Sequence, residues 1–251
     1  MKFQAVEAAI AAVSRGEIVV VADDPRRENE GDLILAASAA TPEKVAFMVR
    51  HTSGLLCVSA RRQRLDALEL PLMVPQNTES HQTAFTISVD YRVGTSTGIS
   101  AEDRSATIRA LADAEMGPGE FARPGHVFPL RARDGGVLVR PGHTEAASDL
   151  AELAGLPPLG ALAEIVNLDG SMARGVQLER FAQEYGLAFI TIAELVEYRR
   201  ATERVVALRP AHPALDDQPA SVTGQELSLF GAARATPRRQ AVLSAGQCPA
   251  R

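Results

Sequence analysis

Residues 17–37 read EIVVVADDPRRENEGDLILAA, two apolar runs separated by a charged loop. The first run, Glu17–Val21, is rich in β-branched residues and predicts a buried strand, because such side chains pack well on a pleated surface. Asp23-Asp24-Pro25 gives this strand a sharp exit. The second run, Asp32–Ala37, predicts a strand that comes back after the polar loop. We therefore expect a pair of buried strands with charged side chains at their connection.

Strands and helices alternate further along the chain. Thr41-Pro42-Glu43 is typical of a helix start, with a capping hydroxyl and proline at the first helical position, and Ser100 precedes a second capped helix. The predicted helices span residues 2–15, 41–50, 61–68, 100–113, 144–154 and 176–185, and a last one begins near residue 193. The further predicted strands span residues 55–59, 85–90, 127–131, 136–140, 163–168 and 188–191, with a Gly/Pro-rich connection over 117–125. This alternation predicts a single α+β domain, a three-layer α/β/α fold with a mixed twisted sheet.

The composition changes near residue 209. Residues 210–251 hold five of the 15 prolines, few aromatic residues and no lasting hydrophobic period. Such a segment buries too little apolar surface to offset the entropy of ordering it. We expect one compact domain over residues 1–205 that carries the function, and a disordered tail over residues 206–251.

Charge and composition exclude several classes of protein. Twenty-six basic residues against 31 acidic ones give a formal net charge of −5, the opposite of a nucleic-acid-binding footprint. No apolar run approaches the roughly 18 residues of a membrane span, and no apolar signal segment follows Met1. We therefore expect a cytoplasmic protein without nucleic-acid or membrane partners. Cys57 and Cys248 lie 191 positions apart without metal-ligand spacing, which argues against a disulfide framework or a structural zinc site.

Acidic side chains are concentrated in the loop between the first two predicted strands. Glu28, Glu30 and Asp32 are two positions apart and would share one side of an extended segment. Three carboxylates on one side repel one another unless a cation neutralises them, and hard oxygen ligands suit Mg²⁺ or Mn²⁺. The alternative for this segment, taken alone, is a solvated acidic loop.

The tetrapeptide Arg-Pro-Gly-His occurs twice. In Arg140-Pro141-Gly142-His143-Thr144 it precedes a predicted helix, whose first N–H groups would suit a phosphate together with the arginine and threonine side chains. In Arg123-Pro124-Gly125-His126 it ends a Gly/Pro-rich turn. Taken alone, His143 is as consistent with a capping residue as with a ligand, and His126 is as consistent with a satisfied structural histidine as with a functional one.

Three further side chains are candidates for a functional role because of the segments in which they lie. Glu164 lies within an apolar strand, so it is either a solvated edge residue or a desolvated acid with a raised pKa. Cys57, in the run Leu55–Val58, is of a kind that is more often a small core residue than a nucleophile. Thr97 belongs to the hydroxyl-rich loop Thr95–Gly98 that precedes a capped helix.

Taken in order, these segments resemble the 3,4-dihydroxy-2-butanone-4-phosphate synthase family of riboflavin biosynthesis. The resemblance covers about residues 3–200. Ser96 stands where the family often has threonine, which keeps the hydroxyl. The matching motifs are DDPRRENEGDLILAA (23–37), residues 54–59, residues 84–90, TGISAEDR (97–104), RPGHVFPLR (123–131) and RPGHTEAASDL (140–150).

The resemblance implies a lyase that converts D-ribulose 5-phosphate into 3,4-dihydroxy-2-butanone 4-phosphate and formate. It also implies a homodimer on a three-layer mixed-sheet fold, with two Mg²⁺ or Mn²⁺ ions per site and no redox cofactor. Many relatives carry a fused GTP cyclohydrolase II domain, and residues 201–251 are too short for it and lack its cysteine cluster. We therefore expect a monofunctional chain.

The same resemblance implies roles for individual residues. The metal ligands would be Glu28 and His143. The residues matched to catalysis are His126 and Glu164, with Glu30 and Cys57 lining the site. The residues matched to substrate and phosphate binding are Arg27, Glu28, Asp32, Thr97, Arg140, Pro141, Gly142, His143, Thr144 and Glu164.

Two other functions stay open. A non-catalytic phosphosugar or nucleotide-binding protein on the same fold would keep the binding motifs, but it would have no use for both Glu164 and His126. A metal-dependent phosphoester hydrolase would release inorganic phosphate from a sugar phosphate. Proton removal next to a ketone needs a base and a cation that stabilises the enolate, and the combination of carboxylates, histidine and metal ligands can supply both.

Overall fold

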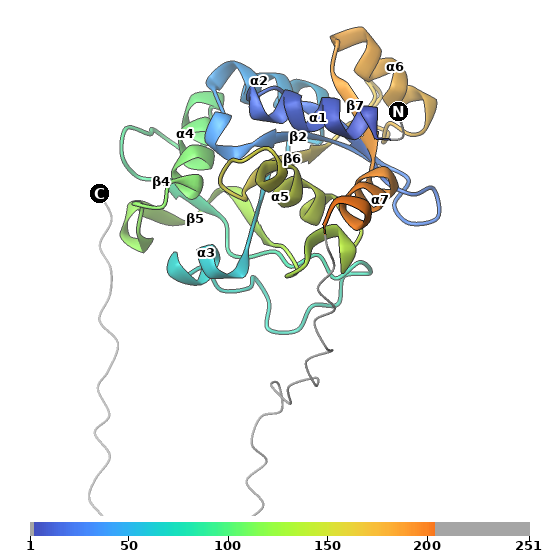
Figure 1. Ribbon diagram of the computed structural model, residues 1–251. Helices are drawn as coiled ribbons and strands as arrows, with labels where there is room; N and C mark the ends of the chain where they lie inside the picture. The colour runs from blue at the N-terminus through green and yellow to red at the C-terminus, as the bar shows by residue number, and fades with distance from the viewer. Residues whose placement is uncertain (1–2, 204–251) are drawn as a thin grey trace, which may run out of the picture. The chain divides into compact units, whose positions relative to one another are not determined.

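One mixed sheet of seven strands organises the computed structural model, which describes residues 3–203 of the chain (Figure 1). The predicted tail over residues 206–251 lies outside the described residues. The strand order across the sheet is β4-β5-β3-β6-β2-β1-β7. The strands are β1 (Val19–Ala22), β2 (Gly31–Ala36), β3 (Cys57–Ala60), β4 (Val89–Tyr91), β5 (Phe121–Arg131), β6 (Gly160–Glu164) and β7 (Ala188–Thr191).

Helices connect most of these strands. The hydroxyls of Thr41, Ser100 and Thr191 accept backbone N–H groups at the starts of α2, α4 and α7, which satisfies donors that a helix leaves open. Within residues 3–203, none of the helices has the length and apolar character needed to cross a membrane. The helices are α1 (Gln4–Ser14), α2 (Pro42–His51), α3 (Arg62–Ala67), α4 (Ala101–Ala112), α5 (His143–Leu153), α6 (Val176–Tyr185) and α7 (Ile192–Thr202), with short 3₁₀ turns η1 (Ala37–Ala39), η2 (Pro118–Glu120) and η3 (Gly136–Leu138).

Strand pairing explains why the centre of the sheet is buried. β2 lies between β1 and β6 and pairs antiparallel with both, so that Leu33 has Val20 on one side and Ala163 on the other. β3 pairs parallel with β5 and antiparallel with β6, and β7 pairs parallel with β1. This mixed sheet confirms the fold class predicted from the sequence.

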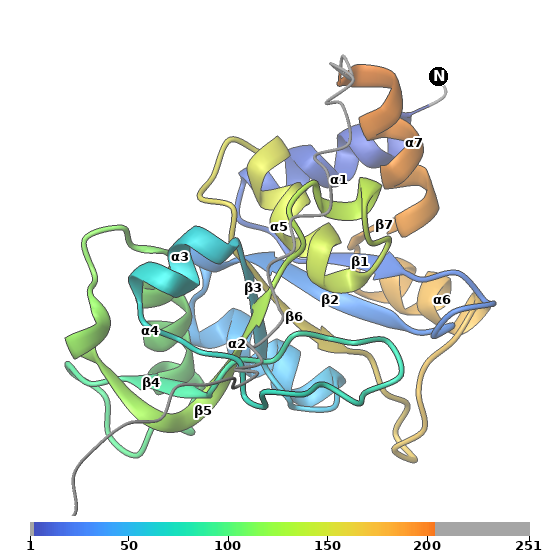
Figure 2. The same cartoon turned by 90° about the horizontal axis from the view of Figure 1, so that it is seen from below.

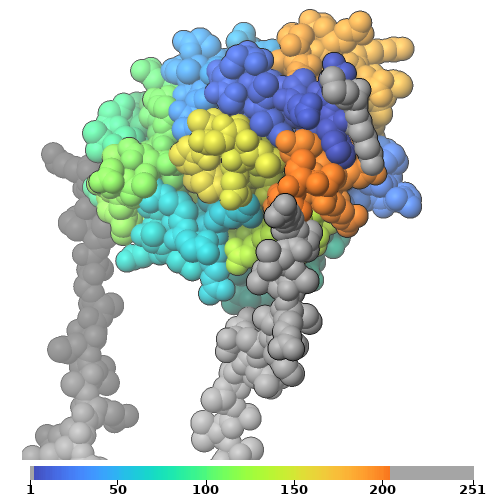
Figure 3. Space-filling model, viewed as in Figure 1, coloured from blue at the N-terminus to red at the C-terminus, as the bar shows by residue number. Residues whose placement is uncertain are grey.

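Two hydrophobic cores lie on opposite faces of the sheet. Val20 and Leu33 belong to the core under α2, α4 and α6, whereas Val21 and Ile34 belong to the core under α1, α5 and α7. Figure 2 shows α1, α5 and α7 gathered on one side of β1 and β2. Figure 3 shows α1, in blue, and α7, in orange, side by side on the surface. The fold therefore has the three layers expected from the sequence.

The structure corrects two predicted strands. Residues 136–140 form the 3₁₀ turn η3 and the irregular residues after it instead of a strand, because Gly135 and Gly136 adopt positive φ angles of 90° and 61°. The Val137 N–H donates to Asp149 Oδ2 at 2.8 Å, so it is not available to a neighbouring strand. The strand predicted at 163–168 is β6, which runs from 160 to 164; Ile165 and Val166 form only isolated bridges, with Thr52 and Met172.

The outer edge of the sheet also differs from the prediction. The strand predicted at 85–90 is reduced to β4, and Phe85 and Thr86 form only isolated bridges. β5 begins at Phe121, inside the predicted Gly/Pro-rich connection, because β4 pairs with its first residues across an irregular register. Pairing between distant segments therefore overrides the local tendency of glycine and proline to form a turn.

Gly160 allows α5 to lie close against the sheet. A Cβ at this position would be 2.7 Å from the Ala147 carbonyl oxygen and 2.8 Å from the Ala147 Cβ. Gly160 stands opposite Ala36 of β2 and Ser59 of β3, so α5 packs on the centre of the sheet. Because α5 begins at His143, this close approach sets where that histidine lies.

We predict that Gly160→Ala destabilises the domain by about 1–3 kcal/mol, because overpacking this contact displaces α5. The matched control is Gly119→Ala, since no atom lies within 4 Å of a Cβ there. The control should change the free energy of unfolding by no more than about 0.5 kcal/mol. Urea unfolding followed by circular dichroism measures both values. Equal effects of the two substitutions would show that the packing of α5 does not depend on glycine at residue 160.

Candidate functional site

A cavity of about 420 Å³ lies where the β1–β2 loop, the end of β6 and the start of α5 come together. Side chains from β3 and from the segment 79–85 complete its wall. Acidic and basic groups therefore face one another around one opening. The lining residues are Arg27, Glu28, Glu30, Asp32, Cys57, Glu79, His81, Thr83, Phe85, Leu130, Arg140, His143, Thr144, Leu162, Ala163 and Glu164.

Most residues singled out by the sequence line this cavity. Pro141 and Gly142 form the connection between Arg140 and the start of α5. His126 and Thr97 are not among the lining residues. The predicted residues that the structure brings together at the cavity are Arg27, Glu28, Glu30, Asp32, Cys57, Arg140, His143, Thr144 and Glu164.

His143 is oriented by a backbone carbonyl. It is the first residue of α5, it is buried, and its Nε2 donates to the Val21 carbonyl of β1 at 3.1 Å. Nδ1 consequently points toward Glu28 Oε2 at 3.5 Å and Asp32 Oδ1 at 3.7 Å. Burial lowers the pKa of His143, but the charges of Asp32 and Glu28 outweigh burial and raise it above the ordinary value. Nδ1 is therefore the atom that holds a proton among the carboxylates or offers its lone pair to a cation.

The carboxylate of Asp32 is buried inside the domain. Among residues 3–203, no hydrogen-bond donor is paired with its Oδ1. Burial raises the pKa of Asp32; the charge of His143 opposes this effect, and the neighbouring Glu164 and Glu28 add to it. Pairing of β2 with β6 places Asp32 directly opposite Glu164. A buried oxygen without a donor, surrounded by further carboxylates, fits a site that a cation completes.

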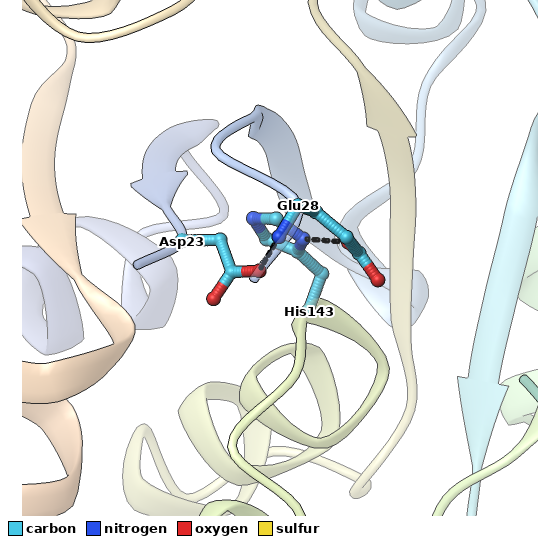
Figure 4. A group of neighbouring side chains, drawn as sticks. All are labelled: Asp23, Glu28 and His143. Atoms are coloured by element: carbon cyan, nitrogen blue, oxygen red, sulfur yellow. Dashed lines mark hydrogen bonds and ion pairs between the residues drawn. The ribbon is translucent and has the colours of Figure 1, made fainter. Parts of the chain in front are cut away.

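Asp23, Glu28 and His143 bring possible ligand atoms within 4.8 Å of one another (Figure 4). Asp23 is not singled out by the sequence as a ligand, although it begins the Asp-Asp-Pro exit of β1. The Asp23 carboxylate accepts from Arg27 Nη1 at 2.6 Å and from the Glu28 N–H at 3.2 Å. These hydrogen bonds therefore orient Arg27 and Glu28, which come four and five residues later in the same loop.

Glu28 stays ionised although it is partly buried. Burial raises the pKa of Glu28. The hydrogen bond with His143 and the charge of Arg27 outweigh burial, so the pKa of Glu28 is below its usual value. Arg27 Nη2 lies 2.9 Å from Glu28 Oε1, so this side chain is held between an arginine and a histidine. The remaining negative charge faces the cavity and suits a cation.

Two arginine side chains approach the backbone that precedes α5. A Cβ at Gly142 would lie 2.5 Å from Arg140 Nη1 and 3.1 Å from Arg27 Nη2, so glycine permits this approach. Gly142 is the N-cap of α5, where a helix presents open N–H groups and the positive end of its dipole. Thr144 adds a hydroxyl that lines the cavity. This anion cradle suits a phosphate, as the sequence predicts.

Arg140 is held from two sides. Its Nη1 donates to Glu145 Oε2 at 2.7 Å, and its Nη2 donates to the His81 carbonyl at 3.1 Å and the Thr83 hydroxyl at 3.2 Å. The sequence assigns no role to residues 79–83, which lie in an irregular connection. Its polar composition was the available signal, but no spacing links it to residues some 60 positions later. Only the fold brings it over the cavity.

The remaining wall of the cavity contains a thiol and two carboxylates. Cys57 is 5% exposed, and burial raises the pKa of its thiol, so the thiol is neutral and serves as a small wall residue rather than a nucleophile. Glu30 lies 3.4 Å from Arg174. Glu164 is half-buried at the end of β6, and its Oε2 accepts the Ser53 hydroxyl at 2.7 Å. Glu164 is therefore an oriented wall residue and not a freely solvated one.

Comparison with known proteins identifies the family. The model of a family described as 3,4-dihydroxy-2-butanone 4-phosphate synthase matches residues 7–198. The chain belongs to this synthase family. The synthase of Agrobacterium fabrum (strain C58) is 57% identical over 198 residues, which cover 79% of this chain and 93% of that relative.

Other members of the synthase family are longer. The riboflavin biosynthesis protein RibBA of Salinispora arenicola (strain CNS-205) is 59% identical over 206 residues, which cover 82% of this chain and 49% of that relative. The chain spans about half the length of several curated relatives that it matches. A crystal structure of a 3,4-dihydroxy-2-butanone 4-phosphate synthase in complex with two magnesium ions matches with a TM-score of 0.77 at 46% identity, covering 80% of this chain and 98% of that chain.

Two residues that the resemblance to the synthase family singles out lie away from the cavity. His126 is on β5, four residues and thus about 13 Å along the strand from Leu130, which lines the cavity. The His126 side chain is 43% exposed. Thr97 is exposed in the connection between β4 and α4. The predicted site residues therefore fall into a cavity group and a second group at the β4–β5 edge.

Proposed function

We propose that the chain is a magnesium-dependent carbon–carbon lyase that converts D-ribulose 5-phosphate into 3,4-dihydroxy-2-butanone 4-phosphate and formate in riboflavin biosynthesis. The observation that carries the proposal is one cavity that joins the anion cradle at the start of α5 to the carboxylates around His143. A phosphorylated ketose needs both, because its phosphate has to be held while a proton is removed next to the ketone. Membership of the synthase family supports the same reaction.

The cavity would hold the two ends of the substrate differently. The phosphate would lie against Gly142, where Arg27 and Arg140 can donate charge-assisted hydrogen bonds beside the positive end of α5. The carbon chain would then extend toward Glu28 and Glu164. Anchoring the phosphate would orient the carbon atoms and reduce the entropy that has to be lost in reaching the transition state.

Glu28 and His143 would hold a divalent cation, which we propose to be Mg²⁺, with Mn²⁺ able to replace it. The fit rests on two observations: the Val21 carbonyl aims His143 Nδ1 at Glu28, and the buried Asp32 Oδ1 has no donor within the part of the chain that the structure describes. The relative solved with two magnesium ions supports two ions per site. When bound, the ions would stabilise negative charge on the ketone and neighbouring hydroxyl oxygens.

Proton transfers would fall to Glu164 and His126. Glu164 stands opposite Asp32 on the adjacent strand, and the Ser53 hydroxyl orients its carboxylate. Cys57 and Leu162 form an apolar part of the wall beside it, which limits the access of water. A carboxylate in this setting can exchange protons with a substrate held in the cavity.

We also propose a homodimer that shares its sites between the two copies. His126 is separated from the cavity of its own chain by about 13 Å of β5. In a twofold-symmetric dimer, any contact between a surface of one copy and a surface of the other occurs twice. A contact between the β4–β5 edge of one copy and the cavity of the other would therefore place each His126 at the partner cavity. Val93 and Ile99, which flank Thr97, are 63% and 51% exposed and offer apolar surface for such a contact.

The proposed catalytic domain spans residues 1–205, which is supported by the family match over residues 7–198. The disordered tail over residues 206–251 stays a prediction from the sequence. The cytoplasmic location stays a prediction as well.

We predict that the purified protein releases formate from D-ribulose 5-phosphate with Mg²⁺. Glu164→Gln should lower kcat by about 10²–10⁴-fold with a much smaller change in KM, because glutamine keeps the size but cannot exchange a proton. Glu184→Gln, exposed on α6, is the control and should keep the wild-type rate. A coupled formate dehydrogenase assay measures both.

A normal kcat for Glu164→Gln would end its assignment to proton transfer. Binding of ribulose 5-phosphate without formate release would favour the non-catalytic binding protein. Release of inorganic phosphate in place of formate would favour the hydrolase.

We predict that Glu28→Gln raises the Mg²⁺ concentration needed for half-maximal activity by about tenfold or more, because it removes the charge that faces His143 Nδ1. Asp24→Asn is the matched control, since Asp24 lies in the same loop but pairs with Arg26 and does not line the cavity. A chelator should abolish formate release, and Mg²⁺ or Mn²⁺ should restore it. Activity that survives thorough chelation would remove the cation from the proposed mechanism, as would wild-type metal dependence in Glu28→Gln.

We predict that two inactive variants complement each other in a mixed dimer. Glu164→Gln alters the cavity and His126→Asn alters the β4–β5 edge, so a dimer with one copy of each variant contains one intact shared site. Heterodimers isolated with two different affinity tags should recover about half of the wild-type activity. Verified heterodimers without activity, or a monomer in light scattering, would contradict the shared site.

A further inference from the structure

Asp90 and His126 form a carboxylate–imidazole pair on the adjacent strands β4 and β5. Asp90 Oδ1 accepts a hydrogen bond from the His126 backbone N–H at 2.8 Å, and Asp90 Oδ2 lies 2.6 Å from His126 Nδ1. One carboxylate therefore engages both the backbone and the ring of the same residue. The pair lies outside the cavity, and the sequence assigns Asp90 no role beyond its place in the motif 84–90.

The backbone around Asp90 is packed closely enough to hold its carboxylate in one orientation. Gly98 has a φ of +91°, and a Cβ there would clash with Asp90 Oδ2. A Cβ at Gly125 would clash with the carbonyl carbon of Val89. Glycine at both positions lets two backbone segments close around Asp90, which is only 9% exposed. This packing keeps both carboxylate oxygens directed at His126.

The pair also determines which ring nitrogen of His126 carries the proton. An ionised carboxylate only accepts hydrogen bonds, so Nδ1 is the donor to Asp90. Nε2 is then left with the lone pair, on a side chain that is 43% exposed. The ring is therefore held in the form that can take a proton at Nε2.

We propose that Asp90 is the positioning residue for His126: it holds the Nδ1–H tautomer and stabilises the imidazolium that forms when Nε2 takes a proton from the substrate. This inference rests on the proposed function, in which His126 moves protons of a phosphorylated ketose. The proton passes from the substrate to Nε2 and returns to a later intermediate, so no co-reactant is consumed. A base whose second nitrogen is held by a carboxylate is a general arrangement for proton transfer.

Asp103 offers a matched comparison in the same region. It is a second buried carboxylate, and it accepts hydrogen bonds from the Ser96 N–H and hydroxyl and from the Gly98 N–H. Its contacts hold the loop that closes over Asp90 and the start of α4. Asp103→Asn therefore disturbs the packing of this loop while leaving the partner of His126 in place, which separates positioning from packing.

Nitrogen-15 NMR reads the tautomer directly in a chain with five histidines, and His126→Gln identifies the His126 signals by their loss. We expect the Nδ1–H tautomer in the wild type and in Asp103→Asn. Asp90→Asn should convert His126 largely to the Nε2–H tautomer. A wild-type protein with His126 in the Nε2–H form would overturn the proposal, as would an Asp90→Asn protein that keeps Nδ1–H. The wild-type measurement requires neither a variant of Asp90 nor turnover.

Kinetics tests the consequence for catalysis. Asp90→Asn should lower kcat by about 10²–10⁴-fold with KM changed by less than about threefold. The double variant with His126→Asn should cost little more than His126→Asn alone, because the pair acts as a unit. A normal kcat in Asp90→Asn would overturn the positioning role. If the wild type releases no formate, the proposed function fails, and the tautomer measurement alone decides whether Asp90 positions His126.

Discussion

The buried carboxylate of Asp32, on β2, constrains how the rest of the site is built. Asp32 is buried with an oxygen that has no donor among residues 3–203, and Glu28 and Glu164 add further charge beside it. A buried carboxylate is costly unless other groups compensate for it. His143 supplies opposing charge to Asp32 and Glu28, and Arg27 supplies it to Glu28. All four side chains line the cavity. The elements that carry these groups consequently have to meet at the start of β2.

The topology of the sheet brings those elements together. Antiparallel pairing of β2 with β6 sets Asp32 opposite Glu164, and β1 contributes the Val21 carbonyl that orients His143 from 122 positions away. Because Gly160 has no side chain, α5 lies close to the sheet and its N-terminus reaches the cavity. The same helix start then serves two purposes, since it carries a candidate metal ligand and forms the anion cradle with two arginines. A phosphate and a cation can be bound a short distance apart for this reason.

The β4–β5 edge is built on a different physical principle. The carboxylates of the cavity repel one another and need a cation, whereas Asp90 is satisfied by His126 through two hydrogen bonds and needs no ion. Within one chain, His126 does not line the cavity that holds these carboxylates. In the proposed dimer the two groups would meet, so that a cation-dependent centre and an independent proton acceptor act on one substrate.

The amino-acid sequence alone determined the strands β1 and β2, the helices with capping hydroxyls and the layered mixed sheet, because apolar spacing and capping are local signals. Its motifs also identified most of the cavity, including Glu28 and His143. The turn at 136–138, the long strand β5, and the roles of Asp23, Asp90 and residues 79–83 were decided only by tertiary structure. In each of these cases the partner is set by the folded chain: Val137 donates to Asp149, β5 pairs with β4, and Arg140 bonds to His81. Hydrogen bonds between segments that are distant in sequence leave no local pattern, so only the folded chain reveals them.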